Sequence, residues 1–93
     1  MAVQVRVPTL LQATTQGERV VAAEGATLGD LINNLESRYP GFKEKLTTDD
    51  GGLHRFINVY KNDEDVRYLG KLETPVSDGD VISILPAVAG GVV

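Results

Sequence analysis

The sequence predicts an α+β fold in which a mixed sheet of about five strands packs on one main helix. Several short stretches alternate apolar and polar residues with the two-residue period of a half-buried strand. One longer stretch repeats its apolar residues with the period of a helix instead. The chain has 93 residues, which is enough for a single domain with one modest core.

The N-terminal part of the chain is predicted to form a β-hairpin. Residues 3–7 (VQVRV) alternate three valines with polar residues, so the valines would face the core. Pro8 ends this strand, and a polar stretch with a turn around Gly17 follows. Residues 19–23 (RVVAA) return as the second strand.

The main helix is predicted over residues 27–39 (TLGDLINNLESRY). The apolar side chains at the i, i+3, i+4, i+7 positions of one helical face are Leu28, Leu31, Ile32 and Leu35. Thr27 is expected to cap the N-terminus, where the helix dipole also favours the charge of Asp30. The Pro-Gly pair at 40–41 ends the helix, and residues 42–46 add a short helical turn.

The C-terminal half is predicted to supply the remaining strands. Residues 47–52 form a loop by composition, and the β-branched and aromatic segment 55–62 is the best candidate for a central strand. An acidic turn leads to a short returning strand at 66–69, and a turn containing Asp-Gly-Asp leads to the last strand at 81–85. This order of elements is that of the ubiquitin-like β-grasp fold.

Composition narrows the classes of function. The net charge of −4 disfavours a nucleic-acid partner, and the absence of cysteine removes disulfides and thiolate chemistry. The apolar runs are too short to cross a membrane, and the N-terminus lacks the pattern of a secretory signal. We therefore expect a cytoplasmic protein with no nucleic-acid or membrane partner.

The side chains offer little equipment for catalysis or metal binding. His54 is the only histidine, and we expect it to form a local hydrogen bond before the strand. The acidic run 63–65 lacks the spacing of a calcium loop and is expected to be a solvated turn, as is the pair 49–50. The sequence thus predicts no catalytic residue, no metal site and no freestanding enzyme.

The remaining candidate is the segment 86–93 (PAVAGGVV), which we separate as a flexible, extended tail from a domain over 1–85. Its diglycine has two interpretations. In the first, it belongs to a disordered end of the chain that has no function. In the other, Gly91 is the reactive C-terminus: a diglycine lacks Cβ atoms and can thread a narrow channel, so that its carboxylate reaches ATP and is adenylated. AMP would then be the leaving group for a sulfur or amine nucleophile.

Two valines conflict with a reactive Gly91. Val92 and Val93 would move the terminal carboxylate about 7 Å along an extended chain and add β-branched side chains. We therefore expect a precursor that is cut between Gly91 and Val92, since exposed termini are accessible to proteases.

Three stretches make the whole chain resemble a known family: TLGDLINNLESRYPG, LHRFINVYKNDEDVRYLG and DGDVISILPAVAGG. It is similar to the ubiquitin-like sulfur-carrier proteins, which include the small subunit of molybdopterin synthase and the thiamine sulfur carrier. Within that family it looks most like the actinobacterial carriers of cysteine biosynthesis.

The resemblance implies a carrier with no bound cofactor that partner enzymes act on. A ubiquitin-activating-like adenylyltransferase/sulfurtransferase, using ATP and a sulfide source, would convert Gly91 to a thiocarboxylate. A pyridoxal-phosphate-dependent cysteine synthase would accept the sulfur, and a JAMM-type zinc metalloprotease would release the product and is a candidate for removing Val92 and Val93. Such carriers dock through the exposed sheet face and the tail root. The tail residues that would thread into partners are Pro86, Ala87, Val88, Ala89 and Gly90.

Other functions stay open on the sequence. The sulfur could go to molybdopterin or to a natural product such as a thio-sugar. The chain could also be a ubiquitin-like modifier joined to protein lysines, or a β-grasp binding module whose tail never reacts.

Overall fold

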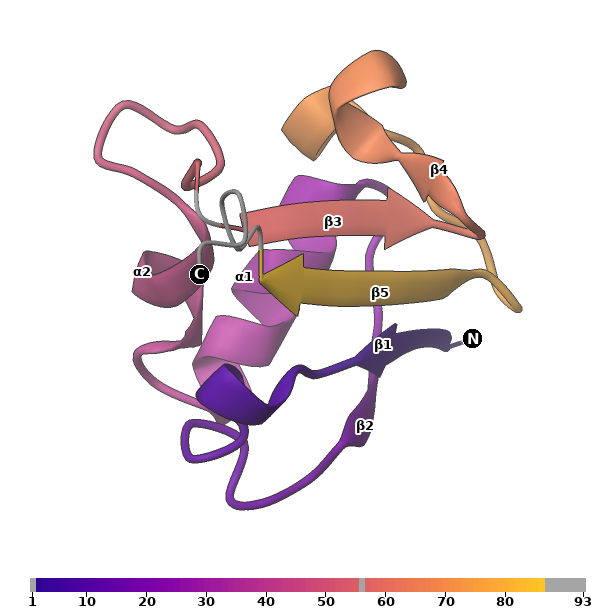
Figure 1. The fold of residues 1–93 in the computed structure, drawn as a ribbon. Helices are drawn as coiled ribbons and strands as arrows, with labels where there is room; N and C mark the ends of the chain where they lie inside the picture. The colour runs from indigo at the N-terminus through magenta and orange to yellow at the C-terminus, as the bar shows by residue number, and fades with distance from the viewer. Residues whose placement is uncertain (1, 56, 87–93) are drawn as a thin grey trace.

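The structure, a computed structural model, describes residues 2–55 and 57–86. Within these residues one five-stranded mixed sheet lies with its inner face against the main helix, as predicted (Figure 1). The strands and α-helices are β1 (Val3–Arg6), β2 (Val20–Ala23), α1 (Leu28–Arg38), α2 (Phe42–Leu46), β3 (Ile57–Lys61), β4 (Glu64–Asp65) and β5 (Val81–Pro86). Three 3-10 turns complete them: η1 (Thr9–Leu11), η2 (Val66–Tyr68) and η3 (Lys71–Glu73).

The last strand of the described chain lies in the middle of the sheet. The strand order is β2-β1-β5-β3-β4, in which β5 runs parallel to β1 and antiparallel to β3 (Figure 1). Val5 pairs with Ile82, and Ser83 pairs with Tyr60. This arrangement puts the C-terminal end of β5 beside the first residues of β3.

The core lies between the sheet and the two helices. Alternate strand residues face inward, including Val5, Val59 and Ile82, each 1% exposed. The buried face of α1 is the one predicted from its spacing: Leu28, Leu31, Ile32 and Leu35. Burying one such side chain completely stabilises the fold by about 1.5–3 kcal/mol. Phe42 and Leu46 of α2 close one end of the core.

The ends of α1 follow the sequence prediction. Thr27 Oγ1 accepts a hydrogen bond from the Asp30 amide at 3.2 Å, which caps the first turn. Near the C-terminal end of α1, the carboxylate of Glu36 accepts hydrogen bonds from the amides of Lys43 and Gly41, which lie beyond the helix. These bonds, the one from Lys43 first, hold the pKa of Glu36 below its usual value. Glu36 thereby joins α1 to α2.

The prediction of a strand at residues 66–69 is wrong. The returning strand β4 covers only Glu64–Asp65, and the chain then forms the 3-10 turn η2. Asp65 causes the change, because its carboxylate accepts a hydrogen bond from the Arg67 amide at 2.9 Å and caps the turn. Val66 is fully buried beneath it. At the other end of the sheet, β5 includes Pro86 and so runs one residue beyond the predicted strand.

Candidate functional site at the end of strand β5

The predicted reactive segment begins where β5 ends. Pro86 lies opposite Ile57 of β3, and Leu85 lies opposite Asn58. Leu85 is 47% exposed although it is a large apolar residue of a central strand. The predicted tail and processing residues Ala87, Val88, Ala89, Gly90, Gly91 and Val92 lie outside the described residues. The structure therefore describes the start of this segment, Pro86 at the end of β5, which we call the root and from which the chain continues toward Gly91.

The root opens onto the outer face of the sheet, opposite α1. Arg6, Ser83 and Tyr60 form one row across β1, β5 and β3, since Arg6 and Tyr60 both pair with Ser83. A hollow of about 360 Å³ on this face is lined by Arg6, Tyr60, Asp63, Ser83 and Leu85. The outer face thus combines a cation, a phenol and an exposed apolar side chain close to the root. Such a mixture of polar and apolar groups is typical of surfaces that bind other proteins.

The start of β5 is held by a network around Asp80. Its carboxylate accepts hydrogen bonds from the Asn62 side-chain amide at 2.9 Å and from the Ser77 amide at 2.8 Å. These two hydrogen bonds, the one from Asn62 first, hold the pKa of Asp80 below its usual value. Lys61 Nζ stands 3.8 Å from the same carboxylate. β5 therefore enters the sheet in a fixed position.

His54 forms a hydrogen bond, but with a distant partner and not the predicted local one. Its Nε2 lies 3.0 Å from the backbone oxygen of Glu44, ten residues earlier in α2. Within residues 2–55 and 57–86, no three or more histidine, aspartate or glutamate side chains gather into a set that could hold a metal ion. In the same part of the chain, no helix is long and apolar enough to span a membrane.

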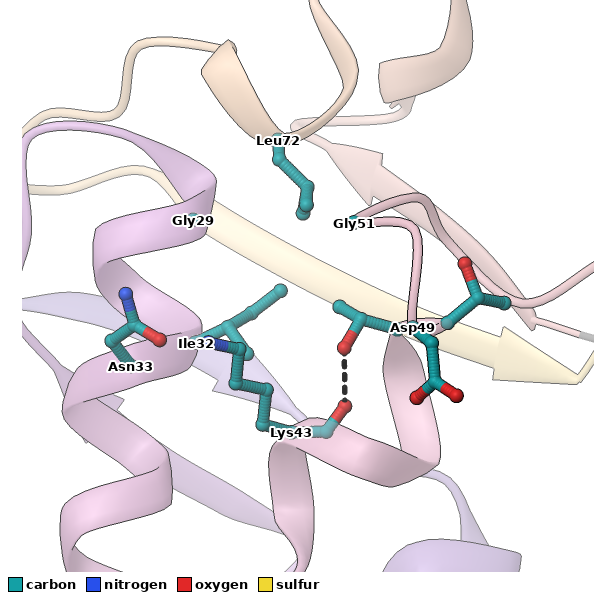
Figure 2. A pocket seen from close by; sticks show the side chains of 9 residues that line it. Gly29, Ile32, Asn33, Lys43, Asp49, Gly51 and Leu72 are labelled. Atoms are coloured by element: carbon teal, nitrogen blue, oxygen red, sulfur yellow. Dashed lines mark hydrogen bonds between the residues drawn. The ribbon is translucent and has the colours of Figure 1, made fainter.

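A second hollow lies on the helix side of the molecule. It has a volume of about 250 Å³ and is bordered by α1, α2, the loop after α2 and Leu72 of η3 (Figure 2). Thr47 Oγ1 donates a hydrogen bond to the Lys43 carbonyl at its wall, shown as the dashed line. This hollow shares no lining residue with the hollow on the outer face. It is therefore separate from the candidate site.

Sequence reasoning did not assign the outer-face residues of the site. The sequence signal for them is their place in the strands, where Arg6, Tyr60 and Ser83 alternate with buried apolar residues. Alternation predicts that these side chains face outward. Only the register places them side by side, because it joins residues 77 positions apart, such as Gln4 and Val81.

The fold and the position of the root define the class of protein: a β-grasp domain whose C-terminal strand runs through the centre of the sheet. The chain belongs to the ThiS family, whose model matches residues 5–91. The predicted family is thereby confirmed. The match ends at Gly91, two residues before the last residue of the sequence.

Individual relatives agree with the family assignment. The chain is 52% identical over 93 residues to the sulfur carrier protein CysO of Mycobacterium tuberculosis (strain ATCC 25618 / H37Rv), covering 98% of this chain and all of the relative. A chain of the crystal structure of the Amycolatopsis orientalis BexX/CysO complex matches with a TM-score of 0.90 and 56% identity, over 97% of this chain and all of that one. Small archaeal modifier protein 3 of Haloferax volcanii is 40% identical over 68 residues, which is 73% of each chain.

Proposed function

We propose that this chain is a sulfur carrier protein that serves cysteine biosynthesis. The observation that supports this most is its 52% identity to the sulfur carrier protein CysO over the whole of that relative. The chain itself acts as a co-substrate on which partner enzymes work. The root at Pro86 leaves five residues of chain to Gly91, which reach at most about 18 Å when extended. That reach suits insertion of the tail into a partner's active site while the domain stays outside.

The proposed chemistry takes place at the carboxylate of Gly91. One carboxylate oxygen attacks the α-phosphorus of ATP, and pyrophosphate leaves as the acyl adenylate forms. Sulfide, delivered by the sulfur source of the activating enzyme, attacks the acyl carbon, and AMP leaves with the C–O bond electrons. The product is a thiocarboxylate on Gly91. The two glycines serve this step because they lack side chains that a narrow channel would exclude.

Val92 and Val93 must be removed before this chemistry. The family match supports a cut between Gly91 and Val92, since it stops at Gly91. A JAMM-type zinc metalloprotease is the proposed processing enzyme. The same kind of protease is proposed to release the cysteine later, after a pyridoxal-phosphate-dependent synthase has added the thiocarboxylate to an aminoacrylate and an S-to-N acyl shift has followed.

The outer face of the sheet is the proposed docking surface for these enzymes. Leu85 supplies an exposed apolar contact next to the root, and Arg6 and Tyr60 supply polar contacts in the same hollow. A relative has been crystallised as a BexX/CysO complex, which supports stable docking of a carrier of this kind. The adenylyltransferase/sulfurtransferase is expected to use this face because it must hold the domain while the tail reacts.

Intact-mass spectrometry tests the proposal. A chain ending at Gly91 is incubated with the cognate activating enzyme, ATP and a sulfide source, and it should gain the mass difference between sulfur and oxygen. The full-length chain should gain nothing until the metalloprotease is added. A chain ending at Gly91 with Gly91→Leu should keep its fold and stay unmodified. If the chain ending at Gly91 shows neither adenylation nor the mass gain, the sulfur-carrier function is wrong.

A protein modifier is the second candidate function. The 40% identity to small archaeal modifier protein 3 favours it. It predicts isopeptide adducts between Gly91 and lysines of other proteins, which the same mass spectrometry on digested extract would detect. A carrier used only for sulfur transfer should give the thiocarboxylate and no such adducts.

A further inference from the structure

Arg67 holds the outer edge of β3 where β4 no longer covers it. β3 has five residues and β4 only two, so within the described part of the chain the first residues of β3 have no strand partner on that side. The Arg67 guanidinium fills this gap: Nη2 donates to the Ile57 carbonyl at 2.7 Å and to the His54 carbonyl at 3.4 Å. Nη1 donates to the side-chain oxygen of Asn58. One side chain thus ties three residues around the start of β3.

The backbone of Ile57 shows which way each bond points. Its N–H donates to the His54 carbonyl at 3.1 Å, and its carbonyl accepts from Arg67. Both polar groups of Ile57 therefore face away from β5. Because hydrogen bonding alternates along an antiparallel strand, the backbone of Asn58 faces β5 and pairs with Leu85.

These same residues position the root of the tail. Ile57 lies opposite Pro86, and Asn58 lies opposite Leu85. Because the polar groups of Ile57 face away from β5, the Ile57–Pro86 pair has no backbone hydrogen bond, and Asn58–Leu85 is the last hydrogen-bonded pair between the two strands. The final pairs of β5 are therefore only as well placed as the start of β3, and that start is held by η2 through Arg67.

We propose that Arg67 is a positioning residue for the reaction at Gly91. By fixing Ile57 and Asn58, it sets the place and direction from which the chain leaves Pro86 toward the reactive glycine. The inference rests on the proposed function. A carrier whose root shifts still docks through the outer face, but its tail enters the partner's active site in the productive geometry less often.

The geometry requires an arginine in particular. Nη2 donates to two backbone carbonyls, and Nη1 donates to the side-chain oxygen of Asn58. The planar guanidinium therefore binds three separate acceptors. The charge partner Asp65 is more distant, at 4.0 Å from Nη1. A lysine keeps the charge but presents a single nitrogen, and it should not replace the fork.

Arg38 offers a matched control at the opposite edge of the sheet. Its Nη2 donates to the Ala22 carbonyl of β2, so it too holds the edge of a strand with a guanidinium. β2 and β3 are separated by β1 and β5 in the sheet. Arg38→Ala therefore removes the same kind of contact far from the tail root.

The experiment compares Arg67→Ala, Arg67→Lys and Arg38→Ala in the chain ending at Gly91. Adenylation kinetics with the activating enzyme give kcat and KM, and hydrogen exchange gives the protection of the Asn58 and Leu85 amides. Arg67→Ala should lower kcat about tenfold, because misplacing a reacting group slows the step, while KM changes less than about twofold. The two amides should exchange faster. Arg67→Lys should behave like Arg67→Ala, and Arg38→Ala like the unmutated chain.

The outcomes distinguish a failure of the positioning role from a failure of the carrier function. If the unmutated chain is adenylated but Arg67→Ala leaves the exchange of both amides unchanged, or if Arg38→Ala lowers kcat equally, the positioning role is wrong and the carrier function stands. If the unmutated chain ending at Gly91 is not adenylated by its cognate enzyme, the carrier function is wrong, and the role of Arg67 in it falls as well. Full rescue by Arg67→Lys would also overturn the inference, since charge alone would then suffice.

Discussion

The side-chain amide of Asn62 donates to the carboxylate of Asp80 over 2.9 Å, while its oxygen accepts from the Val81 amide over the same distance. One side chain at the end of β3 thus holds both the turn before β5 and the first residue of β5. Asn62 adopts a positive φ of 49°, a conformation that asparagine tolerates better than most residues. We expect the contact with Asp80 to make the entry of β5 sensitive to pH.

Acid should weaken this entry through Asp80. Its pKa is lowered in the folded protein by the bonds from Asn62 and Ser77, so the ionised form stabilises the fold above the ordinary aspartate pKa of about 3.9. That contribution is lost as the pH falls through the lowered pKa. Asp80→Asn should therefore reduce the free energy of unfolding at pH 7 and make little difference near pH 2. Urea unfolding at several pH values measures this, and an equal difference between the two proteins at pH 2 and at pH 7 would contradict the role of Asp80.

Loss of the cap of α1 should cost a measurable part of the stability. Thr27→Ala removes the acceptor of the Asp30 amide, and we expect the free energy of unfolding to fall by about 1 kcal/mol. Thr27→Ser keeps the hydroxyl and should stay close to the unmutated chain. Chemical denaturation of the three proteins checks the order, and an equal loss for alanine and serine would contradict the capping role.

Gly25 should not tolerate a side chain, for a steric reason alone. A Cβ at this position would stand 2.7 Å from the Leu31 amide nitrogen and 2.8 Å from Asp30 Cβ. Gly25→Ala should destabilise the fold by about 1–3 kcal/mol, as overpacking does. At Gly52 the nearest atoms are 3.6 Å away, so Gly52→Ala should be tolerated. Thermal unfolding of both variants tests the contrast, and similar melting temperatures would show that the backbone near Gly25 yields easily.

Leu85 should matter for docking and little for folding. Leu85→Ser removes an exposed apolar contact next to the root, and we expect it to weaken binding to the activating enzyme about tenfold. Leu10→Ser removes a side chain that is 55% exposed on η1 and should leave binding unchanged. Titration calorimetry with the enzyme measures both. Equal losses for the two variants would mean that general surface apolarity, and not the outer face, drives the association.

The sequence predicts the main helix well because its signal is local. The spacing of Leu28 and its partners, the cap at Thr27 and the Pro-Gly stop all act within one or two turns of the chain. The strand prediction for residues 66–69 is wrong because their apolar residues suit either a strand or a turn. The hydrogen bond that the Asp65 carboxylate accepts from the Arg67 amide, together with the burial of Val66, favours the turn.

Contacts between distant segments lie beyond such reasoning. The histidine prediction gave His54 a hydrogen bond but not its partner in α2. Arg67 left no sequence signal at all, since its strongest acceptor is the backbone carbonyl of Ile57, a group that every residue carries. The candidate Gly91 came from the diglycine itself and lies outside the described residues. What the structure adds is the place from which that glycine is presented.

The central position of β5 determines when the nascent chain can complete its sheet. A nascent chain that has not yet reached Val81 has β1–β2 on one side and β3–β4 on the other, with nothing to join them into a sheet. The outer face, which draws on β1, β5 and β3, exists only after residues 81–86 have entered. A partner that docks on this face as proposed would therefore not bind a chain that ends before Val81, so activation of the terminus would be coupled to completion of the sheet.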